Sequence, residues 1–279
     1  MRQIYKILFL FILGFSNSLA NNLNDYEKYI ISLDESCKKN DLKSCHNLAT
    51  AFYEGVIIQQ DLNAAFILYN KACNGKFLES CFNVGVMSEN GQGVKKDEFL
   101  AFDKYSLTCT KDKKNRYKQS VGCPNLAILY IDGRGVKQDY KKGIEILDET
   151  CKNSNIKSCD IITKIYKDGY LGIKPRPEEF KKILEQQCKK SNAIFCHKLA
   201  DELLSKNDNN LYEKAILILK KACDLKLAKS CLDLGVLYAN GKFVNQNLEI
   251  AKDYFGKACD LRDPIGCESY KILNKDAEY

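Results

Sequence analysis

The chain has 279 residues, of which 28% are charged, 14 are cysteine and only two are histidine. Its formal net charge is +7, and its lysines are spread over the chain, which favours a solvated surface over a nucleic-acid interface. Zinc modules usually need cysteines two to four residues apart, often with histidine, and the chain has no such cysteine spacing.

The first twenty residues have the pattern of a secretory signal peptide. A charged start is followed by an apolar run over 7–15, and the small residues Ser18 and Ala20 suit a cleavage site. The run is too short to span a bilayer, and an uncleaved anchor is the alternative. No cysteine follows Ala20 directly, so lipid attachment there is not expected. We therefore expect a signal peptide over 1–20 and a periplasmic or secreted protein.

The cysteines form seven evenly spaced pairs. Six pairs are eight residues apart, the third is fourteen apart, and the first members recur every 35 to 42 residues. The pairs are Cys37/Cys45, Cys73/Cys81, Cys109/Cys123, Cys151/Cys159, Cys188/Cys196, Cys223/Cys231 and Cys259/Cys267. A fixed period of this size is typical of a repeat array. An even count with no leftover thiol is typical of a disulfide framework.

Each repeat predicts two helices, one ending at its first cysteine and the other beginning at its second. An apolar residue lies four positions before the first cysteine of every repeat, and in five repeats a small residue lies eight before it, as with Tyr69 and Ala65 in the second repeat. A small residue four positions after the second cysteine and an aromatic seven after it, such as Ala127 and Tyr130, continue the helical spacing. The expected repeats cover about 24–59, 61–96, 97–138, 139–175, 176–210, 211–246 and 247–279, within one domain over 21–279.

The helix ends are predicted from capping residues. A serine before the second cysteine suits the N-cap of the second helix, as at Ser44, Ser80, Ser158 and Ser230. A glycine closes that helix, as at Gly55, Gly91, Gly133, Gly169 and Gly241. An Asp or Asn then suits the N-cap of the next repeat, as at Asp61, Asp97, Asp139 and Asn247. Each repeat is therefore helix, short loop, helix and tight turn.

The cysteine pairs are expected to be disulfides that link the two helices of one repeat. The first cysteine lies near the end of the first helix and the second near the start of the second helix. Disulfides persist outside the cytosol, in agreement with the predicted signal peptide. Each closes a loop of about eight residues, worth roughly 2–3 kcal/mol in the entropic treatment.

The small residues of both helices, the Gly91-Gln-Gly-Val and Gly133-Arg-Gly-Val turns and the period near 36 resemble the Sel1-like repeat family, relatives of tetratricopeptide repeats. Cysteines eight apart in each unit resemble its Helicobacter cysteine-rich protein branch. The resemblance covers the chain after the signal peptide. It implies a right-handed superhelix of helix pairs, and it implies penicillin binding or weak β-lactamase activity.

The later repeats depart from the pattern. A strongly basic insert over 110–120 separates the third pair and is expected to be an exposed loop, with a binding finger as the alternative. The fourth repeat ends in an unusual segment over 170–177, and the fifth has no closing glycine. The last helix becomes polar towards its end, as a terminal capping repeat requires.

The sequence contains no convincing catalytic site. Ser-x-x-Lys occurs at Ser36/Lys39 and Ser154/Lys157, about the two matches expected by chance, and Ser88-Glu-Asn90 is an isolated Ser-x-Asn. Lys-Thr-Gly is absent. His46 and His197 each follow a second cysteine directly, and we expect both to be exposed on helix surfaces rather than to bind metal.

Two functions follow as expectations. The first is an exported, monomeric scaffold that binds a protein, a peptide or a peptidoglycan fragment on its superhelical surface. The second, which rests on the family resemblance alone, is a β-lactamase that binds and hydrolyses β-lactams. Neither expectation includes a cofactor, a metal ion, a nucleic acid or a membrane span after signal cleavage, and the sequence names no catalytic residue.

Overall fold

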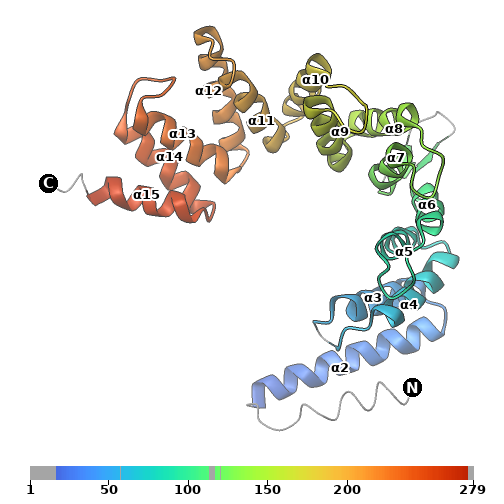
Figure 1. Ribbon diagram of the computed structural model, residues 1–279. Helices are drawn as coiled ribbons and strands as arrows, with labels where there is room; N and C mark the ends of the chain where they lie inside the picture. Colours follow the sequence, from blue (N-terminus) through green and yellow to red (C-terminus); the bar gives the residue numbers. More distant parts are fainter. Residues whose placement is uncertain (1–16, 57, 113–116, 120, 276–279) are drawn as a thin grey trace. The chain divides into compact units, whose positions relative to one another are not determined.

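The computed structural model describes residues 17–56, 58–112, 117–119 and 121–275 (Figure 1). The chain divides within one helix into two compact units, residues 1–161 and 162–279, which are described separately. The first sixteen residues of the predicted signal peptide lie outside the described part, and residues 17–20 begin a helix. None of the described helices is long and apolar enough to cross a membrane. The single domain over 21–279 stays a prediction.

The described residues form fourteen helices and one short β-hairpin. The N-terminal unit holds α2 (Asn17–Lys38), α3 (Leu42–Glu54), α4 (Leu62–Asn74), α5 (Leu78–Asn90), α6 (Glu98–Leu107), α7 (Cys123–Asp132), α8 (Tyr140–Lys152) and the start of α9 (Ile156–Asp168). The C-terminal unit holds the rest of α9 with α10 (Pro177–Lys189), α11 (Ala193–Leu204), α12 (Asn209–Asp224), α13 (Ala228–Asn240), α14 (Leu248–Asp260) and α15 (Pro264–Lys275). The predicted all-α repeat fold of seven helix pairs is confirmed.

All fourteen cysteines are paired as predicted, and none is free. Each disulfide joins the end of the first helix of a repeat to the start of the second, with Cα atoms 4.4 to 4.8 Å apart. Every helix pair therefore carries one local covalent link. The seven bridges are Cys37–Cys45, Cys73–Cys81, Cys109–Cys123, Cys151–Cys159, Cys188–Cys196, Cys223–Cys231 and Cys259–Cys267.

The second cysteine of six repeats lies further inside its helix than predicted. The expectation that the second helix begins at this cysteine is correct only for Cys123, the first residue of α7. In the other six repeats it is wrong, because the helix begins three residues earlier. The cysteines that lie inside the first turn of α3, α5, α9, α11, α13 and α15 are Cys45, Cys81, Cys159, Cys196, Cys231 and Cys267.

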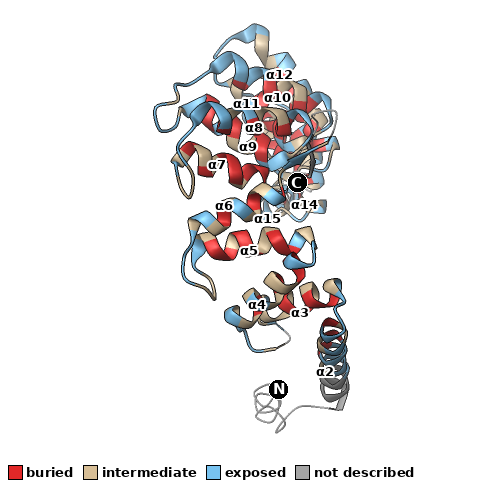
Figure 2. Cartoon of the chain, turned by 90° about the vertical axis from the view of Figure 1, so that its right-hand side faces the viewer, coloured by how far each residue is buried: buried red, intermediate tan, exposed pale blue. Residues whose placement is uncertain are grey.

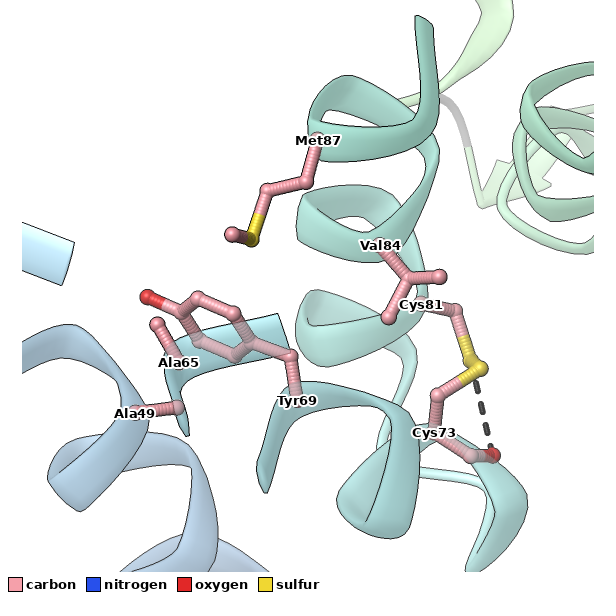
Figure 3. Close-up of a cluster of buried hydrophobic side chains, with 7 residues drawn as sticks. All are labelled: Ala49, Ala65, Tyr69, Cys73, Cys81, Val84 and Met87. Carbon is pink, nitrogen blue, oxygen red and sulfur yellow. Dashed lines mark hydrogen bonds between the residues drawn. A yellow bond between two sulfur atoms is a disulfide. The ribbon is translucent and has the colours of Figure 1, made fainter. Parts of the chain in front are cut away.

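Helices α3, α4 and α5 share one apolar cluster. Ala49 of α3, Ala65 and Tyr69 of α4, and Val84 and Met87 of α5 form a buried cluster (Figure 3). The alanines leave room for the Tyr69 ring, which explains why small and large residues alternate at four-residue spacing. Figure 2 shows buried residues along the helix faces and mostly exposed or partly exposed turns. The second repeat is thus packed against the first through a shared apolar cluster.

A lysine also ties one repeat to the next. The ammonium of Lys71 in α4 donates to the carbonyl oxygen of Cys37 at 2.7 Å, and Lys221 in α12 donates to that of Cys188 at 2.8 Å. Both lysines lie two positions before the first cysteine of their repeat. A cation at the negative end of the helix dipole is favourable, so the contact stabilises the preceding helix end.

Most predicted caps are confirmed, and one group is wrong. Gly55, Gly91, Gly133 and Gly241 end their helices in the left-handed conformation, and Asp61, Asp97, Asp139 and Asn247 cap the following helices. The serines are not N-caps, because the second helices begin two residues earlier at Leu42, Leu78, Ile156 and Ala228. Ser44, Ser80, Ser158 and Ser230 therefore lie buried inside the first helical turn.

The second helices begin early because the loop between the two helices of a repeat is tight. A residue with positive φ, such as Lys76 at 72° or Lys226 at 68°, reverses the chain within two residues of the first helix. The second helix then starts early enough to carry its serine and its cysteine in the first turn. In α3 the N-cap is Asp41, whose side chain accepts a hydrogen bond from the backbone of Ser44.

The basic insert of the third repeat is not simply a loop. Thr110–Lys111 (β1) pairs antiparallel with Tyr117–Gln119 (β2) in a short hairpin, and residues 113–116 and 120 lie outside the described part. The ammonium of Lys111 lies 2.6 Å from the carboxylate of Glu149 in α8. The described part of the insert is therefore folded and attached to the next repeat.

The departures of the later repeats are local. Tyr170 and Ile173 form an isolated antiparallel bridge after α9, which accommodates the unusual segment over 170–177. The fifth repeat ends α11 at Ser205 in a right-handed helical conformation rather than at glycine. The last helix exposes Ile265 and Ile272 beside its polar residues.

Candidate functional site

The cysteines that the sequence singles out are structural and do not form a reactive site. All fourteen are bonded in disulfides, so no thiol is left as a nucleophile or a metal ligand. The second cysteine of the terminal repeat, Cys267, is partly exposed. Those of the other six repeats are at most 1% exposed: Cys45, Cys81, Cys123, Cys159, Cys196 and Cys231.

The C-terminal unit contains an open depression of about 440 Å³ on helices α9, α10 and α11. It is built from the second helix of the fourth repeat and both helices of the fifth. Its lining residues are Thr163, Lys164, Lys167, Asp168, Phe180, Lys198, Asp201, Glu202 and Ser205. Two adjacent repeats therefore form one concave surface.

Helical spacing brings these residues onto facing sides. The α9 residues recur at 163, 164, 167 and 168, and the α11 residues at 198, 201, 202 and 205, so each set follows one face of its helix. Phe180 of α10 also lines the depression and is largely buried, and the Lys167 ammonium is 5.9 Å from the centroid of its ring. The depression thus has an aromatic base and charged walls.

The charges in the depression are mixed. Lys164, Lys167 and Lys198 are matched by the carboxylates of Asp168, Asp201 and Glu202. Partial burial raises the pKa of the Asp201 carboxyl, and the nearby carboxylate of Asp233 raises it further, while His197 acts in the opposite direction. The surface is suited to a ligand that carries both basic and acidic groups.

A buried histidine lies directly behind Asp201. His197 is only 6% exposed, and its Nδ1 is 3.0 Å from the hydroxyl of Ser230 in α13. Its Nε2 is 3.2 Å from the Asp201 carboxylate and 3.6 Å from that of Asp233. Within the described residues, these three side chains are a group whose ligand atoms all lie within 4.8 Å of one another.

The expectation of two exposed histidines is therefore wrong. His46 is half-buried, with its ring centroid 5.3 Å from that of Tyr69 and 5.0 Å from that of Phe77. Its Nδ1 is 2.8 Å from the hydroxyl of Ser80 in the next repeat. In both histidine-bearing repeats, the position after the second cysteine faces the neighbouring repeat, which buries the ring.

The residues matched to β-lactamase motifs lie on separate repeats. Ser36 is near the end of α2, Ser154 is in the turn before α9, and Ser88 is buried in α5 without a hydrogen-bond partner for its hydroxyl among the described residues. The ammonium of Lys157 donates to the side-chain oxygen of Asn125. In the part of the chain that the structure describes, the only sheet is the two-stranded hairpin. The structure does not bring these residues together.

The sequence prediction missed both the depression and the cluster of His197, Asp201 and Asp233. The available signals were the charged residues at helical spacing in α9 and α11, and the histidine and aspartate four residues apart at His197 and Asp201. Asp233 belongs to another repeat, so only the register between repeats brings it close.

Comparison with known proteins supports the fold. A family model described as Sel1 repeat matches residues 42–77, 78–103, 122–155, 204–227 and 228–263, more than half of the chain. A crystal structure of a Sel1 repeat protein from Oxalobacter formigenes is similar with a TM-score of 0.59 and 22% identity, over 87% of this chain and 98% of that one. A protective antigen of uropathogenic Escherichia coli with an SLR fold gives 0.51 and 19% identity, over 86% of this chain and 58% of that one. No curated protein sequence gave a significant match.

Proposed function

The chain belongs to the Sel1 repeat family, and on that premise we propose that it is an exported scaffold that binds a segment of a partner protein in the depression on α9, α10 and α11. Repeat arrays of this kind present extended surfaces formed by successive units. The disulfide-rich repeat fold is consistent with protein binding.

The composition of the depression is the observation that carries this proposal. Phe180 offers an apolar base, and three lysines and three carboxylates surround it. A peptide segment satisfies such a surface with one apolar side chain, charged side chains of both signs and its own backbone groups. We therefore expect a segment with an apolar residue flanked by basic and acidic residues.

Export is supported by the cysteines and by the predicted signal peptide. Seven disulfides are expected in an oxidising compartment and are rare in the cytosol. The partner is accordingly expected in the periplasm or outside the cell. A peptidoglycan fragment, whose peptide stem also carries amino and carboxyl groups, is the ligand to compare with it.

The proposal is tested by capturing partners from a periplasmic extract without reductant. Lys167→Glu reverses one exposed charge in the depression, and Lys137→Glu reverses an exposed charge in the turn between α7 and α8. We expect the first variant to bind the captured protein about tenfold more weakly, equivalent to about 1.4 kcal/mol, and the second to bind as the unmodified chain does.

If Lys167→Glu and Lys137→Glu weakened the affinity for the captured protein equally, binding in the depression would be contradicted. Titration of purified muropeptides distinguishes the ligand class. Tight binding of muropeptides that is lost in Lys167→Glu, with no protein captured, would replace the protein partner with a cell-wall fragment.

A further inference from the structure

The imidazole of His197 in α11 is held in an unusual position. Its Nδ1 is fixed by the Ser230 hydroxyl at 3.0 Å, so its Nε2 points to the carboxylates of Asp201 and Asp233. Both carboxylates are within ion-pair distance, but among the described residues neither gives Nε2 a hydrogen bond of acceptable geometry. A buried, unpaired ring nitrogen aimed between two carboxylates calls for a ligand.

We propose that His197, Asp201 and Asp233 form a binding site for one divalent transition-metal ion, with Zn²⁺ as the probe. Zinc binds histidine nitrogen and carboxylate oxygen at about 2.0–2.2 Å, so two ligand atoms in a tetrahedral site are roughly 3.3–3.5 Å apart. The two Nε2–oxygen distances of 3.2 and 3.6 Å bracket that separation. Three protein ligands leave the fourth position open to water or to a ligand.

The surroundings also suit a cation. Ser230 fixes the ring orientation, as the outer-shell partners of metal-binding histidines do. The carboxylates of Asp201 and Asp233 both lie within 3.6 Å of the same ring nitrogen, and a dication between them would offset their negative charges. The Lys229 ammonium lies 3.5 Å from the Asp233 carboxylate, but the Lys229 side chain is 65% exposed and can withdraw into solvent.

The first repeat contains a counterpart of His197 that lacks the carboxylates of Asp201 and Asp233. His46 occupies the same repeat position as His197, and its Nδ1 makes the same contact with the serine of the next repeat, Ser80. The positions that correspond to Asp201 and Asp233 hold Thr50 and Asn83. The histidine and its serine are thus shared by two repeats, and only one of them adds two carboxylates.

A metal ion at this site would join α11 of the fifth repeat to α13 of the sixth. Asp201 also lines the depression, but the cation site does not depend on partner binding there. The site is therefore an inference separate from the proposed function.

The test uses the untagged full chain, kept oxidised so that no thiol competes for the metal. Calorimetric titration with zinc chloride at about pH 7.5 is expected to show one saturable site per chain. Asp201→Asn and Asp233→Asn should each weaken binding by at least about tenfold, and His197→Gln should abolish it. His46→Gln is the matched control and should leave zinc affinity unchanged.

A second readout protects the test against a folding defect. The Asp201 side chain is 57% exposed, so Asp201→Asn should fold normally, and zinc should raise the thermal midpoint of the unmodified chain but not of this variant. Absence of saturable binding, or equal zinc affinity in Asp201→Asn and the unmodified chain, would overturn the proposal. The contact of His197 with Asp233 would then serve only to link α11 to α13.

Discussion

His46 and His197 occupy the same position of the repeat, directly after the second cysteine, but they have different neighbours. His46 packs against the rings of Tyr69 and Phe77, and its Nδ1 contacts the Ser80 hydroxyl. Burial lowers the pKa of His46, and the carboxylate of Glu79 only partly opposes this shift. At this site the fold favours the neutral ring, since protonation would place a charge among aromatic side chains.

This pKa shift predicts a loss of stability in acid. The folded-state pKa of His46 lies below its ordinary value of about 6.5, so between the two values the unfolded chain binds more protons than the folded chain. The contribution of His46 is therefore fully present above about pH 6.5 and is lost as the pH falls towards the folded-state pKa. In His46→Phe, the urea midpoint should fall less between about pH 7.5 and about pH 5.5 than it does in the unmodified chain. An unchanged pH dependence in the variant would contradict this assignment.

At the scale of the element, the turns after α5 and α7 depend on their second glycine. Gly93 and Gly135 both have positive φ and pass close to the start of an earlier helix. A Cβ on Gly135 would lie 2.0 Å from the carbonyl oxygen of Glu98, which is backbone and cannot move aside. These glycines therefore fix how closely a turn packs on its own repeat, in addition to allowing the left-handed conformation.

Gly135→Ala should consequently be severely destabilising. We expect a loss of more than about 3 kcal/mol, because steric overlap with the backbone adds to the conformational strain. Gly172→Ala is the matched control, because Gly172 also has positive φ, at 86°, but a Cβ there would meet nothing within 4 Å. The control should cost only about 1–2 kcal/mol. Similar unfolding midpoints for the two variants would show that the close approach has no energetic weight.

Helix positions could be predicted because they depend on local patterns. Apolar residues at helical spacing, glycine at the helix ends and Asp or Asn at the next N-cap are all local features, and the structure confirms them. The serine caps and the start at the second cysteine were wrong because the helix start is set by the preceding left-handed residue, for example Lys76 before Cys81. The hairpin of the insert was missed because its strands have only two and three residues.

The sixth repeat shows how packing overrides a local preference. Its turn holds Phe243 in the left-handed region at φ 68°, where the earlier turns have the second glycine. The ring of Phe243 lies 4.3 Å from that of Tyr212, between centroids. An aromatic contact of this kind helps to offset the strain of a side chain at positive φ.

At the scale of the whole molecule, the candidate sites could not be predicted from sequence because they are formed between repeats. The depression is formed by α9 and α11, which belong to different repeats. The cluster around His197 includes Asp233, which also comes from another repeat. A repeat pattern fixes the fold of each unit and the order of units. It does not determine which exposed side chains of two neighbouring repeats lie opposite one another.

Each disulfide, like the helix pair that it closes, lies within one repeat. Six bridges close loops of eight residues, worth about 2.5 kcal/mol each in the entropic treatment, and Cys109–Cys123 closes one of fourteen, worth about 3 kcal/mol. No bridge connects one repeat to another. Oxidation therefore stabilises each helix pair while contacts between repeats remain non-covalent.

Disulfide mapping by mass spectrometry of the chain isolated without reductant tests whether each helix pair is closed by its own disulfide. A lysine or arginine lies between the two cysteines of every pair, for example Lys76 and Arg262, so trypsin places the two members in separate peptides. We expect seven cross-linked peptide pairs, each joining the neighbouring cysteines of one repeat, and no free thiol. Links between different repeats, or several free thiols, would contradict a scaffold of seven helix pairs that are each closed by their own disulfide.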